Sequence, residues 1–304
     1  GSRKHRQHYG ELTGRADSRQ GPVLATLDPR QLATDGSLPA KIQQLLEKVS
    51  RPLLVNVAGT GISPAGVGQL AGLKSLRGIN LELCPRLDDV AVKQLSRAKG
   101  LVVLSLMGVD VSEKGLESLQ TLKNLRALDL EICEQVSDTS CQALGQMTQL
   151  RVLILKKTGF EKLKITDAGL SQLVALQELE VLNLYGNKIS DVGLVELPKL
   201  AGLQSLDLSL TAITDGGLVY LSSLQKLRHL ELLYSNGFAG PMITDAGLKS
   251  LAKLLTLESL NLVGARIGDA GLSRLESLKK LNHLQLSNTA VTEQGMATLK
   301  RQLP

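Results

Sequence analysis

The sequence predicts an α/β fold, a curved solenoid of about ten repeats with a parallel β-sheet on its concave face and helices on its convex face. Three observations lead to this prediction. Leucine dominates the apolar residues, while aromatic residues make up 2% of the chain and tryptophan is absent. Because large rings normally fill irregular cores, this composition indicates a core in which one small shape repeats. One apolar phrase also returns at nearly constant spacing, and its two halves have different periods.

The first half of each repeat is predicted to be a short strand. Residues 125–130, Leu-Arg-Ala-Leu-Asp-Leu, alternate apolar and polar side chains, which suits a strand with one buried face. The phrase L-x-x-L-x-L begins at Leu101, Leu125, Leu150, Leu179, Leu203, Leu227, Leu257 and Leu281, and in degenerate form at Pro52 and Leu76. Successive units are 24 or 25 residues apart, except for two offsets of 29 and 30, so ten units in register cover residues 52–304.

The second half of each repeat is predicted to be a helix. Residues 165–170 read Ile-Thr-Asp-Ala-Gly-Leu, and Leu173 and Leu176 follow at helical spacing. A Thr or Ser hydroxyl can cap the exposed N–H groups at a helix start, and Asp suits the positive end of the helix dipole. Related phrases begin at Ile189, Ile213 and Ile243. One strand and one helix in about 24 residues is typical of a horseshoe-shaped repeat array.

These motifs resemble the leucine-rich-repeat family, in the subtype whose helix begins T-D-x-G-L. In this respect the chain is similar to the cysteine-containing repeats of F-box substrate receptors and to many bacterial repeat proteins. The resemblance implies protein recognition, although the fold alone names no partner. Two departures weaken the F-box interpretation. Cysteine follows the strand only at Cys84 and Cys133, and residues 38–46 echo the start of an F-box while the repeats already begin at Pro52.

Three segments are expected. Residues 1–22, rich in Arg, Gly, Gln and Ser, form a flexible basic N-terminal arm. Residues 23–51 form an N-terminal cap with a helix over 39–49, and residues 52–304 form the repeat domain. The net charge of +6 is concentrated in the first 51 residues, which hold nine Lys and Arg against five Asp and Glu. Because no basic stripe follows the repeats, nucleic-acid binding is disfavoured.

The cysteines and the hydropathy bear on the compartment. No apolar stretch is long enough to span a membrane. Cys84 and Cys133 lie two repeats apart, too far for a disulfide, and Cys141 takes a buried helix position. All three are therefore predicted to be unreactive core thiols. Unpaired thiols favour a reducing, cytoplasmic compartment, with a secreted bacterial protein as the alternative.

No catalytic residue, cofactor or metal site is expected. The chain has no G-x-S-x-G, P-loop or H-E-x-x-H motif. His229 and His283 lie two strands apart, on the order of 10 Å, which is too far to bind one zinc ion together. Asp207, His229 and Glu231 leave open a three-ligand metal site. We favour the simpler interpretation, in which these side chains belong to a polar binding surface.

The outward-facing strand residues are expected to line up in columns across the concave face. The central column contains Asn56, Asn80, Ser105, Asp129, Ile154, Asn183, Asp207, Glu231, Asn261 and Gln285. The column beside it contains Glu82, Met107, Glu131, Lys156, Tyr185, Ser209, Leu233 and Val263. Because Tyr, Leu, Met and Val mix with charged residues in the second column, its composition is typical of an interface centre.

A partner-binding surface is predicted on this face and on one rim of repeats five to eight. Insertions at 159–164 and 236–242 lie between strand and helix, and they hold the only two phenylalanines. Tyr185 and Tyr234 lie beside them at strand ends, where rings commonly anchor recognition. The alternative is that each Phe pins its own loop. The predicted partner-binding residues are Asp129, Glu131, Lys156, Phe160, Tyr185, Asp207, His229, Glu231, Tyr234 and Phe238.

The sequence thus predicts a protein-interaction module rather than an enzyme, with a folded protein or a peptide as its partner. One alternative is a carbohydrate or cell-surface ligand that stacks on the tyrosines. A second is an F-box-like substrate-receptor fragment. A third is self-association, because the last unit has no evident cap and Leu281, Leu284 and Leu286 lie near an open edge.

Overall fold

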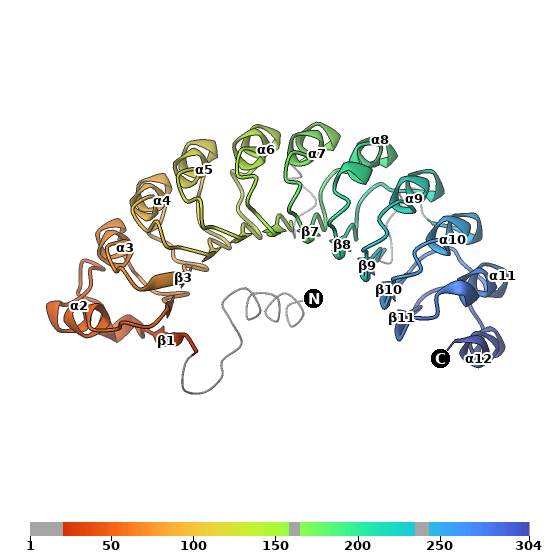
Figure 1. The fold of residues 1–304 in the computed structure, drawn as a ribbon, viewed down its shortest axis with the longest axis horizontal. Coiled ribbons are helices and arrows are strands. Elements are labelled where there is room, and N and C mark those ends of the chain that lie inside the picture. The colour runs from red at the N-terminus through yellow and green to blue at the C-terminus, as the bar shows by residue number, and fades with distance from the viewer. Residues whose placement is uncertain (1–20, 158–164, 235–242, 304) are drawn as a thin grey trace. The chain divides into compact units, whose positions relative to one another are not determined.

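A computed structural model of the chain describes residues 21–157, 165–234 and 243–303, and divides it into two compact units, Gly1–Ile154 and Leu155–Pro304. In each unit one strand alternates with one helix or helical turn along the chain (Figure 1). The expected N-terminal arm falls almost wholly outside the described residues, as do Phe160 and Phe238.

The first unit is a parallel sheet whose strands follow one another in chain order, with helices on one side (Figure 1). Its elements are β1 (Val23–Thr26), η1 (Pro29–Gln31), α2 (Ala40–Glu47), β2 (Leu53–Asn56), α3 (Pro64–Ala71), β3 (Leu76–Asn80), α4 (Asp89–Leu95), β4 (Val103–Ser105), α5 (Glu113–Leu119), β5 (Ala127–Asp129), α6 (Asp138–Gly145) and β6 (Val152–Ile154). Each strand pairs with the next in parallel.

The second unit repeats the same arrangement. Its elements are α7 (Asp167–Leu173), β7 (Val181–Asn183), α8 (Asp191–Leu194), η3 (Leu197–Lys199), β8 (Ser205–Asp207), α9 (Asp215–Leu221), β9 (His229–Glu231), α10 (Asp245–Leu251), β10 (Ser259–Asn261), α11 (Asp269–Leu272), η4 (Ser273–Ser277), β11 (His283–Gln285) and α12 (Glu293–Gln302). The strands β7 to β11 pair in parallel and in chain order.

The predicted α/β solenoid is confirmed, and each of the ten predicted strands is present. The strand β1 was not predicted; it pairs with β2 and lacks the leucine phrase. Within the range 39–49 proposed for a capping helix, the structure has α2 at Ala40–Glu47. The proposed extent of the cap, residues 23–51, stays a prediction.

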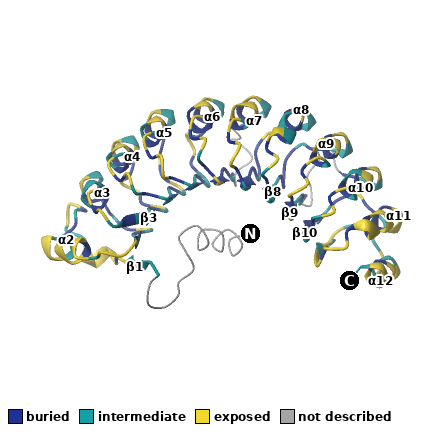
Figure 2. Ribbon diagram, viewed as in Figure 1, coloured by how far each residue is buried: buried dark blue, intermediate teal, exposed yellow. Residues whose placement is uncertain are grey.

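The core of each unit is a stack of leucines. From β3 to β10, the leucines of the strand phrase are almost completely buried, and so are the isoleucines that precede the helix starts (Figure 2). All three cysteines are buried and none of them forms a disulfide, as predicted. The thiols also bond backward to the preceding repeat, from Cys84 Sγ to Val57 O and from Cys133 Sγ to Leu106 O, both at 3.1 Å. Burial raises the pKa of the Cys84 thiol, which keeps it protonated and unreactive.

Neighbouring repeats of the second unit are joined where their helices begin. The Asp at the first helical position accepts two hydrogen bonds from the helix-capping residue of the next repeat. Asp191 Oδ1 accepts from Thr214 N at 2.8 Å, and Asp191 Oδ2 accepts from Thr214 Oγ1 at 2.5 Å. The same two bonds form in Asp167–Ser190, Asp215–Thr244 and Asp269–Thr292, while Asp245 accepts only from Gly268 N. We call these pairs the carboxylate links.

The glycine of the T-D-x-G-L phrase leaves space for the carboxylate link. A Cβ added to Gly217 would lie 2.4 Å from Asp191 Oδ1, and one added to Gly247 would lie 2.3 Å from Asp215 Oδ1. Such distances are far inside van der Waals contact, so an alanine would displace the carboxylate. The Thr, Asp and Gly of the phrase therefore act together across repeats, beyond the helix start that the sequence analysis assigned to them.

Candidate partner-binding surface

The exposed face of the second unit's sheet carries a row of polar side chains. Register places Asn183 opposite Asp207, Asp207 opposite Glu231, and Glu231 opposite Asn261. The central column predicted from the sequence is confirmed within this unit, and within the first unit by the pairing from Asn56 to Ile154. We call Asn183, Asp207, Glu231 and Asn261 the polar row.

Some of these polar side chains accept a hydrogen bond from the backbone N–H two residues later, just after the end of their own strand. Asn183 Oδ1 accepts from Tyr185 N at 2.9 Å, and Asp207 Oδ1 accepts from Ser209 N at 3.0 Å. Asn261 Oδ1 makes the equivalent bond to its own chain two residues later. Asn and Asp commonly close turns in this way. A Glu side chain is one methylene longer, and at Glu231 the neighbouring Ser209 Oγ instead accepts from Leu233 N at 3.1 Å.

The row also contains two amide–carboxylate pairs. Asn183 Nδ2 donates to Asp207 Oδ2 at 3.1 Å, and Asn261 Nδ2 donates to Glu231 Oε2 at 2.8 Å. Burial raises the pKa of Asp207, although its hydrogen bonds to Ser209 and the charge of Lys156 act in the opposite direction. The two carboxylates are thus held in fixed positions by the buried amides on their outer sides.

A second group of side chains lies two residues beyond the polar row. Lys156 Nζ lies 5.4 Å from the centre of the Tyr185 ring, a distance at which a cation and an aromatic face attract. Leu233 and Val263 occupy the same position, two residues after the ends of β9 and β10, and like Tyr185 they are partly exposed. We call Lys156, Tyr185, Leu233 and Val263 the mixed strip. It combines a cation, a ring and aliphatic groups, as interface centres do.

The histidines of this face are separated by one strand. His229 pairs in register with Ser259, and Ser259 pairs with His283. Two strand spacings amount to roughly 10 Å, so these imidazoles cannot bind one metal ion together. Among the described residues, no group of three or more His, Cys, Asp and Glu side chains is arranged to hold a metal ion. Asp207, His229 and Glu231 therefore do not form the three-ligand site that the sequence left open.

The structure corrects the prediction for Tyr234. Its side chain is only 4% exposed, and its hydroxyl donates to Ile213 O at 2.9 Å. Burial raises the pKa of this phenol well above its ordinary value. Alternation along the strand directs Leu233 outward and Tyr234 inward, so the ring packs within the repeat instead of anchoring a partner. The same alternation, applied to the sequence, could have placed it correctly.

Asp129 and Glu131 belong to the first unit. Asp129 Oδ1 accepts from Glu131 N at 2.9 Å, the same bond to the backbone two residues later that Asn183 and Asp207 form.

Leu83, also in the first unit, is 51% exposed at a φ of 52°, a left-handed conformation that leucine rarely adopts. No pattern in the sequence pointed to this exposed leucine.

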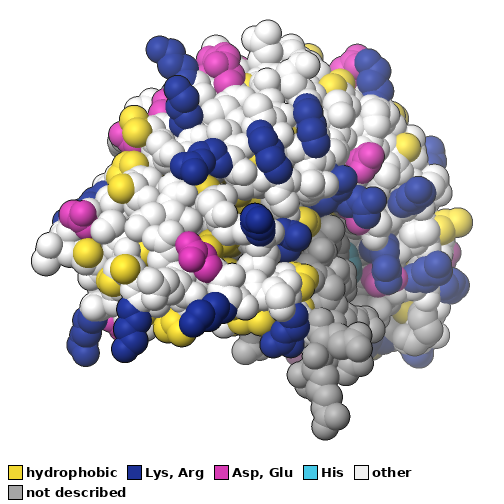
Figure 3. All heavy atoms as spheres, turned by 60° about the vertical axis from the view of Figure 1, so that its left-hand side comes forward, with side chains coloured by type: hydrophobic (Ala, Val, Ile, Leu, Met, Phe, Trp, Pro, Cys, Tyr) yellow, Lys and Arg dark blue, Asp and Glu magenta, His cyan; other side chains and the backbone are white. Residues whose placement is uncertain are grey.

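The helical side of the second unit also carries exposed apolar residues that the sequence analysis did not select. Val192 and Val195 are exposed on and after α8, and Val219 and Tyr220 are exposed on α9. Val195 and Val219 occupy equivalent repeat positions, where α10 has Lys249. A comparison of repeats at this position would have revealed them. Figure 3 turns the first unit toward the viewer, and on that side hydrophobic atoms form separate spots among scattered Lys and Arg side chains.

Comparisons with known proteins concern the fold. Residues 102–303 match the family described as leucine-rich repeat region. No curated protein sequence matches the chain. The structure is similar to an internalin (InlF) of Listeria monocytogenes, with 21% identity, a TM-score of 0.51, and coverage of 86% of this chain and 88% of that one. It is also similar to the mouse RP105/MD-1 complex, with 17% identity, a TM-score of 0.54, and coverage of 93% and 49%.

None of the helices in the described part of the chain combines the length and the hydropathy that crossing a membrane requires.

Proposed function

This chain belongs to the leucine-rich repeat family, and we propose that it works as a protein-interaction module. In this proposal a folded protein or a peptide binds the polar row and the mixed strip, together with the rim that carries the two insertions of repeats five to eight. His229, Asp129 and Glu131 contribute to the same function, as do Phe160 and Phe238, which lie outside the described residues.

The observation that carries the proposal is the mixed strip beside two fixed carboxylates. Tyr185 and Lys156 offer a ring and a cation, while Asp207 and Glu231 offer acceptors held by neighbouring amides. Preorganised polar groups around an aromatic centre lower the cost of ordering an interface. The partner that fits this chemistry presents apolar groups with basic and acidic groups on either side.

The family subtype is part of the proposal. We assign the chain to the T-D-x-G-L repeats that resemble those of F-box receptors and of many bacterial repeat proteins. The carboxylate links support this assignment, because they give each residue of the phrase a structural role. The mouse structure similar in fold is that of a complex, RP105/MD-1, which is consistent with a binding role for a leucine-rich-repeat fold.

Site-specific photo-crosslinking in a lysate of the source organism tests the proposed surface. Benzoylphenylalanine replaces Leu233 on the sheet face in one protein, and the exposed Leu255 in a matched control. We expect one protein to be crosslinked from position 233 and not from position 255. The same product from both positions, or from position 255 alone, would contradict the proposed surface.

Alanine variants then test whether the Tyr185 ring and its Lys156 neighbour contribute to binding, or whether loss of any exposed ring has the same effect. We expect Tyr185→Ala with Lys156→Ala to weaken capture of that protein at least tenfold, as loss of an interface anchor does. Tyr220→Ala removes an exposed ring from α9 and should leave capture unchanged. If soluble glycans raise the melting temperature of the wild type and not of the Tyr185 variant, the carbohydrate alternative replaces the protein partner.

A further inference from the structure

The end of the second unit formed by β11 and α12 differs from every internal repeat of that unit. The strand β10 is buried along its whole length, whereas His283 and Gln285 of β11 are exposed (Figure 2). Leu262, Ile267 and Leu272 of the preceding repeat have no exposed surface. Their counterparts Leu286, Val291 and Met296 are each partly exposed.

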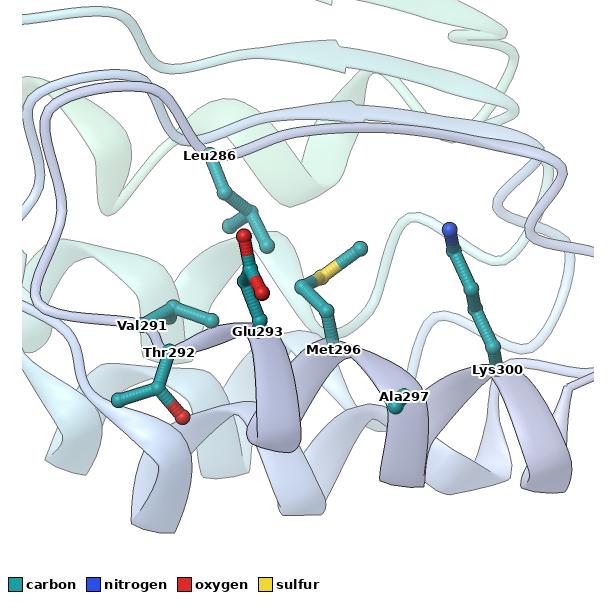
Figure 4. A pocket seen from close by; sticks show the side chains of 7 residues that line it. All are labelled: Leu286, Val291, Thr292, Glu293, Met296, Ala297 and Lys300. Atoms are coloured by element: carbon teal, nitrogen blue, oxygen red, sulfur yellow. The ribbon is translucent and has the colours of Figure 1, made fainter.

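These three side chains line an open hollow. Its volume is about 370 Å³, and it is completed by Thr292, Glu293, Ala297 and Lys300. In Figure 4, Leu286 and Met296 project into the same space, and the charged groups of Glu293 and Lys300 stand on either side of Met296. The hollow is therefore apolar at its centre, with a carboxylate on one side and an ammonium group on the other.

The strand at this end also has hydrogen-bonding groups that point outward. In the preceding repeat, Leu262 N donates to Gln285 O and Gly264 N donates to Ser287 O, both at 2.9 Å. The equivalent donors are Leu286 N and Asn288 N, and neither donates to another described residue. An edge strand of this kind is a template for pairing with another strand.

The charges on α12 decide which occupant fits. Glu293 lies in the first turn of the helix, and Lys300 lies seven residues later in the last turn. Seven residues are about two helical turns, so Glu293, Met296 and Lys300 share one face. Neither Glu293 nor Lys300 forms an ion pair with any residue that the structure describes.

We propose that a second copy of this chain covers this end, related to the first by a two-fold axis. A two-fold axis makes two identical edge strands antiparallel, and likewise two identical helices. Glu293 then faces Lys300 of the partner subunit, and Met296 packs against the partner's Met296. The edge strand β11 pairs with its own copy through the two unused N–H groups. The hollow is self-complementary in charge, in apolar surface and in backbone hydrogen bonding.

Charge reversal and charge exchange test this dimer. Sedimentation velocity of the chain, from about 1 to about 100 µM, should show a monomer–dimer equilibrium. Glu293→Lys alone and Lys300→Glu alone should each lower the association constant roughly tenfold, because attraction becomes repulsion at two symmetric contacts. The double variant that exchanges both charges should recover the wild-type constant, and an equal mixture of the two single variants should form the heterodimer.

Two further variants show whether the hollow itself is the interface. Met296→Lys should abolish the dimer, and circular dichroism should confirm that the variant still folds. Glu117→Lys, an exposed reversal on α5 of the first unit, should leave the association constant unchanged. A chain that is monomeric at all concentrations would overturn the proposal, and so would a dimer that persists unchanged in both Glu293→Lys and Met296→Lys. The surface proposed for a protein partner is untouched by these variants, so the two proposals fail independently.

Discussion

The two units join their helix starts in different ways. In the second unit, four carboxylate links use both a backbone N–H and a hydroxyl, and a fifth uses a backbone N–H alone. In the first unit, Asp89 makes a link of this kind to Ser112. Glu113 takes the Asp position on α5, and it forms no bond to the next repeat among the described residues. The first unit uses the backward bonds of Cys84 and Cys133 at the strand ends as well.

This difference shows what the T-D-x-G-L phrase does. In a solenoid, stability is close to a sum of repeat terms and nearest-neighbour terms. A repeat that keeps the whole phrase adds a charged hydrogen-bonded contact to its neighbour, while a repeat that loses the Asp keeps its helix and loses that contact. We therefore expect mutations of the phrase to cost more in the second unit than in the first.

The largest expected effect comes from the glycine. In Gly247→Ala the new methyl would lie 2.3 Å from Asp215 Oδ1 and 2.8 Å from Leu218 Cδ1, so both the link and the core must shift. We expect a loss of about 3 kcal/mol in the free energy of unfolding, measured with urea. In the matched helical control Gly68→Ala, the methyl meets the flexible end of Gln94 at 3.3 Å. A change within about 1 kcal/mol is expected there, and equal losses at both glycines would refute the steric argument.

Removing the carboxylate itself should have the next largest effect. Asp191→Ala leaves the N–H and hydroxyl of Thr214 without their acceptor, and we expect a loss of about 2 kcal/mol in unfolding free energy. Glu113→Ala changes the same repeat position where no link exists, and should cost less than about 0.5 kcal/mol. Equal losses in the two variants would mean that the acidic side chain stabilises both helices through the helix dipole, and that the link itself contributes little.

In the second unit, a carboxylate at a strand end and a carboxylate at a helix start should change the unfolding free energy with pH in opposite directions. Burial raises the pKa of Asp207 at the strand end, so the folded state binds its proton more tightly than the unfolded state does. Stability from this group is present at pH values below the unfolded pKa, and is lost as the pH rises through the folded pKa. Urea unfolding between about pH 3 and pH 7 should show this loss. Asp207→Asn should flatten this part of the plot of unfolding free energy against pH. If the wild type and the variant gave parallel plots, Asp207 would not be the group responsible for the loss.

The smallest expected effect concerns the helix edge. The hydrogen bonds from Thr292 lower the pKa of Asp269, so stability from this group is present above the unfolded pKa and is lost as the pH falls through the folded pKa. In Thr292→Val the side-chain bond is lost and the backbone bond remains. Carboxyl-carbon NMR should therefore find the pKa of Asp269 raised part of the way toward its ordinary value. An unchanged pKa would show that the hydroxyl bond is not formed in solution.

The repeat pattern predicted the fold because the same leucine phrase sets the position and the inward-facing residues of each strand that carries it. The L-x-x-L-x-L phrase fixes which side chains point inward, so the row from Asn183 to Asn261 followed from the sequence alone. The carboxylate links could not be predicted, because they depend on the distance between helices of neighbouring repeats. The exposed Leu83 depends on a left-handed turn that no residue preference indicates. Tyr234 was misplaced because proximity to an insertion was given more weight than strand alternation.

The carboxylate link between Asp215 and Thr244 spans 29 residues, whereas the link between Asp191 and Thr214 spans 23. The bond lengths are the same, 2.8 Å from the backbone nitrogen in both. The longer repeat therefore keeps its register at the strand and at the helix start, and the added residues do not change the joint between repeats. A segment between two fixed ends of this kind can vary in length and composition at little cost to the fold. Grafted sequences of a similar size at residues 236–242 should be tolerated, which makes this position suited to the evolution or design of new specificity.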